Sequence, residues 1–366
     1  MIKEGNFGYH EAISLMVITI TSKVFFTSPA MLMEIVGTSG WYMTLISAST
    51  AAFAFMFLYL LLKRFPNKNL MEISDLVLGK WAGSIVSFII GGFLLVIASM
   101  NMREFTEVLK VYVLPDSPPS FIMVLFTIGL IMLSFMGLET IARYAKFVIY
   151  ILGAGYVLVV LLSIQNFVPR HLYPVLGYGL DKTIINGVLR SSFYGEIIVI
   201  GIIASSLQGP KEIKRIGFTS LLIAGLLTCS ALLAFNLAFP YTIAQELTSP
   251  MYEMASLIDY GGFFQRMEPI FLFLWNFGTI IEVALLFYAV VLVYCHVFKI
   301  PDKRPILLPM AILLYSLNLI PKGISEVISG VVQYMRTWGW IIYFIPSMLI
   351  LIVAVIRKKK GESRDA

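Results

Sequence analysis

Long apolar runs, interrupted by short charged or turn-rich segments, dominate the pattern of this 366-residue chain. A helix needs about 20 mostly apolar residues to cross the hydrocarbon core of a bilayer. Runs of that kind predict an all-α integral membrane protein, with a single transmembrane domain over residues 1–366. The ninth run is short and contains Pro309. The ten predicted spans lie near residues 12–36, 41–62, 81–110, 121–138, 146–168, 184–208, 215–239, 268–298, 305–321 and 330–356.

The composition agrees with a chain that uses lipid as its solvent. Hydrophobic residues make up 59% of the chain and charged residues only 13%, too few to cover a water-soluble domain of this size. Cys229 and Cys295 both lie in apolar runs, which predicts small core residues rather than a disulfide framework. The three histidines, His10, His171 and His296, have no metal-ligand spacing. We therefore expect no metal and no cofactor.

The positive charges indicate how the chain is oriented. The net charge is +6, and Lys and Arg collect in the cytoplasmic loops of membrane proteins. With ten spans both termini share one side, so both are expected in the cytoplasm. The basic tail RKKKGESR is interpreted as the flank of the last span, and nucleic-acid binding has no support. Of the 27 Lys and Arg residues, 18 fall on the cytoplasmic side: Lys3, Lys63, Arg64, Lys68, Lys80, Arg143, Lys146, Lys211, Lys214, Arg215, Lys299, Lys303, Arg304, Arg357, Lys358, Lys359, Lys360 and Arg364.

The spans divide into two sets of five. Five precede the external segment NFVPRHLYPVLGYGLDK and five follow it, with the division close to residue 183. A 5+5 arrangement reverses orientation between the halves and is the topology of inverted repeats in secondary transporters. We therefore expect one five-helix repeat over residues 1–168 and a second over residues 184–357. The external loop YTIAQELTSPMYEMASLIDYGGFFQRME is too long for a simple connector, and one or two short lid helices are expected in it.

Three ionisable residues fall near the middle of predicted spans one, six and eight: Lys23, Glu196 and Glu282. A charge at that depth costs at least about 2.5–3.5 kcal/mol, which invites a functional explanation. Lys23 lies 12 residues after Glu11 and 11 before Glu34, and at about 1.5 Å per residue each flank is close to half a bilayer. Similar spacings place the two glutamates at the same depth. The three side chains are therefore expected to form one central site.

The sequence around two of these charges is a poor helix former. TITSKVFFTSP concentrates Thr and Ser before Pro29, and LRSSFYGEII places Ser191, Ser192 and Gly195 around the acid of span six. We predict that spans one and six are broken there, because irregular backbone at membrane depth is tolerated where it lines a cavity. The predicted ligand-binding residues are Thr21, Ser22, Lys23, Phe26, Phe193, Tyr194, Gly195, Glu196, Asn276, Thr279 and Glu282.

The central charges allow two interpretations. Lys23 could pair with Glu196 or with Glu282 as a structural bridge between helices, which would still leave one carboxylate without a partner. Alternatively, two acids and one base suit an incoming ammonium group, or a proton shared on one glutamate with a raised pKa. Glu282 is the preferred site acid, because Thr279 lies three residues before it on the same helix face.

Four other charged residues are interpreted as structural or peripheral. Arg103, Glu104 and Glu107 are expected at the outer interface, with Arg103 and Glu107 spaced i,i+4 for an ion pair. Arg190 falls in the outer half of span six. It could gate a path to the site or extend its guanidinium to the interface.

Five segments of the chain, taken together, are similar in sequence to one known protein family. They are RFPNKNLMEISDLVLGKW after span two, REFTEVLKVYVLPDSPP at the end of span three, MGLETIARYAK after span four, HLYPVLGYG before span six and FYGEI within it. These segments resemble the B subunits of spore germinant receptors, a spore germination branch of the amino acid/polyamine/organocation transporter superfamily. The resemblance covers nearly the whole chain, and GLETIAR at residues 137–143 is its most specific part.

The resemblance implies a LeuT-like fold of ten helices in two inverted repeats. It also implies a multi-pass, nutrient-sensing subunit of the spore inner membrane, which binds a small ligand such as an amino acid and acts with receptor subunits A and C. In the family the first break usually contains Gly ahead of the Pro, whereas Ser22 and Lys23 stand here. Lys23 would then meet a ligand carboxylate itself or serve as a built-in ammonium.

A secondary amino acid transporter of the cell membrane is the alternative function. An intramembrane enzyme is disfavoured, because the sequence places no catalytic His or His/Asp cluster at the depth of the central charges. An assembly scaffold without a ligand is disfavoured by those charges themselves.

Overall fold

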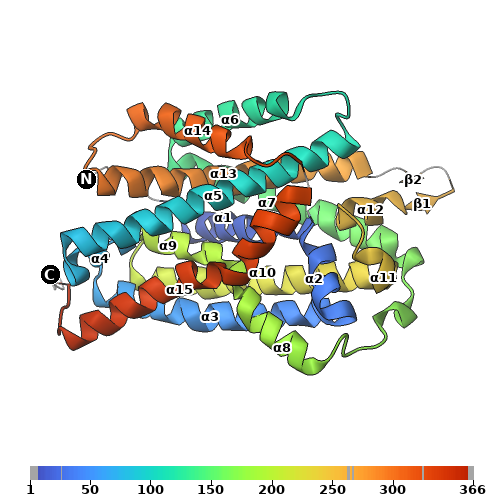
Figure 1. Cartoon of the computed structure of the whole chain (residues 1–366), viewed down its shortest axis with the longest axis horizontal. Helices are drawn as coiled ribbons and strands as arrows, with labels where there is room; N and C mark the ends of the chain where they lie inside the picture. Colours follow the sequence, from blue (N-terminus) through green and yellow to red (C-terminus); the bar gives the residue numbers. More distant parts are fainter. Residues whose placement is uncertain (1–6, 26, 262–263, 266–267, 324, 362–366) are drawn as a thin grey trace.

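The structure, a computed structural model, describes residues 7–25, 27–261, 264–265, 268–323 and 325–361 (Figure 1). Nearly all of these residues are helical. The first half contains α1 (Tyr9–Thr21), α2 (Ser28–Val36), α3 (Gly40–Arg64), α4 (Leu70–Leu78), α5 (Lys80–Tyr112), α6 (Pro119–Met136) and α7 (Leu138–Ser163). The second half contains α8 (Leu180–Leu189), α9 (Val199–Ile202), α10 (Pro210–Ala238), α11 (Tyr241–Ala244), α12 (Pro250–Ser256), α13 (Glu268–Val297), α14 (Arg304–Asn318) and α15 (Gln333–Ile356). Its two short strands, β1 (Asp259–Tyr260) and β2 (Phe264–Gln265), pair antiparallel.

Eight stretches of the described chain are long and apolar enough to cross a membrane. This agrees with the predicted multi-pass helical protein. The count of ten spans stays a prediction, because α1 has only 13 residues and α14 only 15, fewer than a full crossing needs. The two described ends of the chain lie at the same end of the molecule as α4, and α11, α12 and the two strands lie at the opposite end (Figure 1).

The predicted interruptions of spans one and six are confirmed. Between α1 and α2 the chain forms a 3₁₀ turn, Ser22–Phe25, which we call the first break. Between α8 and α9 it forms a nine-residue 3₁₀ segment, Arg190–Ile198, which we call the second break. Long 3₁₀ runs are uncommon and mark hinges or strained sequences. At the two breaks the backbone therefore departs from the continuous α-helix of an ordinary membrane span.

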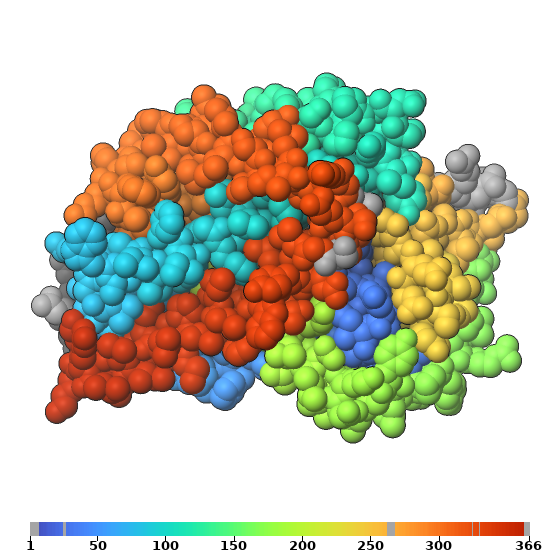
Figure 2. Space-filling model, viewed as in Figure 1, coloured from blue at the N-terminus to red at the C-terminus, as the bar shows by residue number. Residues whose placement is uncertain are grey.

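The loop after α10, which the sequence predicts to be external, contains two short helices, α11 and α12, as predicted. Figure 2 shows part of α2 at the surface of the same end, between the segments that contain α8 and α12. The helix α2 therefore connects the first break with the end of the molecule that holds α11 and α12.

One helix, α4, was not predicted although its start has a sequence signal. The side chain of Asn69 accepts a hydrogen bond from the Glu72 amide at 2.9 Å, and the Glu72 side chain accepts one from the Asn69 amide at 3.1 Å. This reciprocal arrangement is a capping box, and it satisfies two amides at a helix start. The pattern Asn-x-x-Glu between spans two and three identifies the position of α4.

The carboxyl-terminal tail is tied to this helix. Arg357 Nη1 donates to the carbonyl of Val77 at 2.9 Å, and Lys359 Nζ donates to the carbonyl of Leu76 at 2.6 Å. Arg64 Nε, at the end of α3, donates in turn to the carbonyl of Lys359 at 2.7 Å. Cationic side chains are favourable at the carboxyl end of a helix, where carbonyls lack partners. The tail therefore holds the ends of α3, α4 and α15 together.

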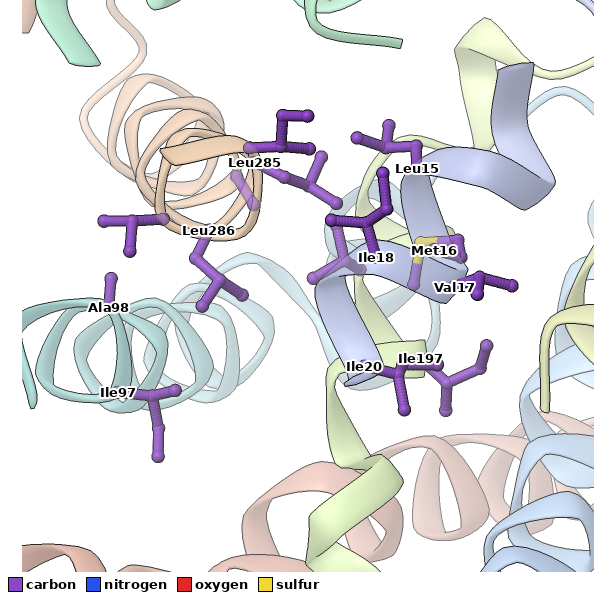
Figure 3. Packing of buried hydrophobic residues seen from close by; sticks show 14 of the residues in the cluster. Leu15, Met16, Val17, Ile18, Ile20, Ile97, Ala98, Ile197, Leu285 and Leu286 are labelled. Carbon is purple, nitrogen blue, oxygen red and sulfur yellow. The ribbon is translucent and has the colours of Figure 1, made fainter. Parts of the chain in front are cut away.

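The helix α1 lies at the centre of the bundle. It packs against α7, α10 and α13, and every residue from Ala12 to Thr21 is buried. Figure 3 shows its Leu15 and Ile18 side chains facing Leu285 of α13, while Ile20 lies beside Ile197 of the second break. Because α1 is enclosed by protein, the irregular backbone that follows it is shielded from lipid, as membrane-depth backbone must be.

Candidate functional site

The first break begins where hydroxyl side chains bond to the helix that precedes them. Thr21 Oγ1 donates to the carbonyl of Val17 at 2.8 Å, and Ser22 Oγ donates to that of Ile18 at 2.7 Å. Such i−4 bonds compete with the regular ladder and bend helices. The next helix, α2, has Pro29 in its first turn, where the missing amide costs nothing. This local chemistry explains why the chain turns between α1 and α2.

The second break is held in place by a close approach of backbone to an aromatic ring. A Cβ added at Gly195 would overlap the ring of Tyr343 on α15. The residues Arg190–Ile198 are all buried. Only glycine lets the backbone of the second break reach this face of α15, so Gly195 has a structural role at the position where a ligand-binding role was predicted.

Lys23 of the first break and Glu196 of the second form an ion pair, and both side chains are 0% exposed. Arg336 of α15 is a second cation at this carboxylate, with Nη1 3.6 Å from Glu196 Oε1. The ring of Phe193 lies 5.3 Å from Lys23 Nζ and 5.2 Å from the Arg336 guanidinium carbon, within the range of cation–π attraction. The sequence left the partner of Lys23 open, and the structure pairs it with Glu196. The Phe193 ring and the Glu196 carboxylate each lie close to both Lys23 and Arg336.

Glu282 of α13 is the carboxylate left outside that pair. Asn101 of α5 donates Nδ2 to its Oε1 at 2.6 Å. Its second oxygen, Oε2, has no hydrogen-bond partner within the described chain, although the residue is fully buried. A buried acceptor without a donor costs free energy, so this oxygen has capacity for one further donor.

Glu104 of α5 does not lie where the sequence placed it. The prediction of an outer-interface residue is wrong, because Glu104 is fully buried and its Oε1 accepts hydrogen bonds from both the amide, at 3.0 Å, and the hydroxyl of Thr27. Thr27 is the residue immediately before α2. The predicted pair of Arg103 and Glu107 is present, with Nη2 and Oε1 2.6 Å apart, but it too is buried.

The remaining predicted site residues surround this centre unequally. Trp275 of α13 donates its indole N–H to the carbonyl of Ser22 at 3.1 Å, and Thr279 donates to the carbonyl of Trp275 at 3.3 Å. Tyr194 is fully buried beside Phe193. Asn276 is half-buried, and its Oδ1 has no partner among the described residues. Phe26 lies outside the described residues.

A small apolar cavity of about 50 Å³ lies beside the first break. It is bounded by α1, α7, α10 and α13, with Thr21, Val24 and Trp275 at the side of the break. The sequence did not predict a cavity towards α7 and α10. Space of this size suits a small apolar group.

A helical membrane protein with two broken helices around a buried charged centre has the architecture of a secondary transporter. Solved transporter structures share this fold. MhsT in complex with L-phenylalanine aligns with a TM-score of 0.64 at 14% identity, covering 98% of this chain and 91% of that one. A Na⁺-coupled sialic acid symporter aligns at 0.64 and 11% identity, covering 94% and 78%. Mhp1, a nucleobase-cation-symport-1 family transporter, aligns at 0.58 and 14% identity, covering 96% and 94%. The fold is therefore the LeuT-like fold of transporters.

The chain belongs to the spore germination protein family, whose model matches residues 8–327. Spore germination protein KB of Bacillus subtilis (strain 168) is 24% identical over 339 residues, 89% of each chain. Spore germination protein A2 of the same organism is 25% identical over 358 residues, 95% of each chain. The resemblance inferred from the sequence is thus confirmed, and the family and fold are those of transporters and receptors rather than enzymes.

Proposed function

We propose that this chain is a transporter-like, nutrient-sensing subunit of a spore germinant receptor. It would lie in the inner membrane of the spore with both termini in the cytoplasm, and act with the A and C subunits of the receptor. The observation that supports this most strongly is the fully buried group of Lys23, Glu196 and Glu282 at the two breaks and α13. Buried charges beside broken helices are typical of ligand and ion sites in transporter folds.

The proposed ligand is a small, amino acid-like nutrient at the centre of the bundle. Its amino group would meet Oε2 of Glu282, which lacks a partner within the described chain. The backbone of Thr21 and Ser22 at the first break offers further polar contacts, and the rings of Phe193 and Tyr194 line the second break. A ligand that contacts both breaks and α13 favours the helix arrangement it fits best, which gives the subunit a means of signalling.

A secondary amino acid transporter of the cell membrane is the competing proposal, and the fold supports it. The solved neighbour MhsT has this fold and was determined with L-phenylalanine bound. The two proposals differ in whether the ligand crosses the membrane or only shifts the conformation of the protein.

Deletion of the gene in the spore-forming host distinguishes them. Under the receptor proposal, deletion abolishes germination in response to one nutrient and leaves the uptake of that nutrient by growing cells unchanged. Reduced uptake without a germination defect would reject the receptor and favour the transporter.

The site is tested by Glu282→Gln, which removes the charge proposed to meet the ligand. We expect the nutrient concentration for half-maximal germination to rise by at least about tenfold, the loss of one charge-assisted hydrogen bond. Protein level in the spore membrane is measured in parallel. The matched control is Glu139→Gln, which makes the same change on a surface-exposed residue of α7. An unchanged dose response for Glu282→Gln would remove Glu282 from the site.

A further inference from the structure

The amino end of α2 holds a carboxylate from another helix. Thr27 occupies the capping position of α2, but its own side chain makes no capping bond to that helix. Its hydroxyl and its amide both donate to Oε1 of Glu104 instead. The carboxylate therefore sits at the amino terminus of a nine-residue helix that begins in the middle of the bundle.

No Lys or Arg of the described chain lies within ion-pair distance of Glu104. The two cations of the central group, Lys23 and Arg336, are both held by Glu196. The two donors of Thr27 and the positive end of the α2 dipole favour the charged form of this buried carboxylate. Its second oxygen, Oε2, is fully buried and has no hydrogen-bond partner among the described residues.

A helix amino terminus at this place is where a fold of this kind recognises the carboxylate of a ligand, because its free amides and its dipole both favour an anion. In this chain the protein supplies that anion itself. A ligand carboxylate would have to displace Glu104 or share a buried position with a like charge, and both are unfavourable.

We propose that Glu104 is a built-in carboxylate that determines the ligand class of the central site. It occupies the carboxylate position at the start of α2 and selects against ligands with a carboxylate. The ligands that fit are small amines, whose ammonium group meets the unpartnered Oε2 of Glu282. Asn101 and Glu104 lie three residues apart on α5, so one helix face carries both the Glu282 contact and the α2 contact. This inference rests on the proposed function and replaces its amino acid-like ligand with a small amine that has no carboxylate.

Matched pairs of ligands test the selection directly. The full chain is purified in lipid nanodiscs, and calorimetry measures its affinity for L-alanine against ethylamine, L-valine against isobutylamine and L-phenylalanine against phenethylamine. Of the three amines, we consider the one that binds most tightly. We expect the wild-type protein to bind it at least about tenfold more tightly than the amino acid paired with it. Wild-type protein that prefers the amino acid in each pair would overturn the proposal without any mutation.

Glu104→Gln then removes the charge with little change of shape. It is expected to shift the affinity ratio by at least about tenfold towards the amino acid, and Glu104→Ala to shift it in the same direction. Glu139→Gln is the control and should leave the ratio unchanged. An unchanged ratio in both Glu104 variants, with binding retained, rejects the role of Glu104 alone. If none of the six compounds binds to folded wild-type protein, the proposed amine-bearing ligand is rejected, and this inference with it.

Discussion

Removing either partner of the Lys23–Glu196 ion pair should destabilise the protein. The cost in stability should depend on which partner is removed. Glu196 has two cationic neighbours, the paired Lys23 and Arg336 at 3.6 Å, whereas among the described residues neither cation has a second carboxylate within ion-pair distance. Lys23→Met leaves Glu196 with Arg336 as a remaining partner. Glu196→Gln leaves two cations in the core with no carboxylate between them. The second change should therefore cost more than the first.

The size of the effect follows from the burial of the pair. Removing one partner of a buried ion pair costs about 3–5 kcal/mol, because the other charge stays in the core uncompensated. We expect Lys23→Met near the lower end of that range and Glu196→Gln near the upper end. The double variant should cost less than the sum of the two by about 1–3 kcal/mol, since each single change already loses the shared interaction.

The measurement is equilibrium unfolding of the full chain in mixed detergent micelles, followed by helical circular dichroism. The control pair is Arg143 and Glu139 on the surface of α7, at 71% and 36% exposure, where the same changes should cost at most about 1 kcal/mol. Strictly additive costs for the buried pair, or a cost of Lys23→Met equal to that of Glu196→Gln, would refute this description of the centre.

Two further changes test neighbouring contacts by the same unfolding measurement. Asn101→Ala removes the donor to Glu282 Oε1 and should cost about 1–3 kcal/mol, the penalty for a buried acceptor left without a partner; a cost below about 0.5 kcal/mol would contradict that hydrogen bond. Gly195→Ala adds a Cβ that overlaps the Tyr343 ring and should cost about 1–3 kcal/mol by overpacking. Adding Tyr343→Ala to it should restore part of that loss, and no recovery would show that the clash lies elsewhere.

The sequence predicts the general plan of this fold because the relevant signals are local. Apolar run length marks the helices, and the Ser and Thr residues before Pro29, with Gly195 in span six, mark the two breaks. Counting residues from the ends of a run places Lys23 and Glu196 at one depth, and the structure pairs them. Depth is readable because a helix rises by a fixed distance per residue.

The rest of the centre depends on how helices are rotated and which helices are neighbours, and neither is a local signal. Glu104 and Asn101 share a face of α5, but only packing reveals that this face meets Thr27 and Glu282. Arg336 lies in the first turn of α15 and was not predicted at all. Its long side chain brings Nη1 to 3.6 Å from Glu196 Oε1.

The hydrogen bonds that tie the carboxyl-terminal tail to α3 and α4 have a practical consequence. Because Arg357 and Lys359 hold the last carbonyls of α4, and Arg64 holds the tail, the chain that leaves α15 is anchored to a second and a third helix. A fluorophore attached just after Gly361 would therefore report the position of α4 as well as that of α15. Energy transfer from such a label to the carboxyl end of α13, near Val297, would follow rearrangement of this end of the bundle in real time.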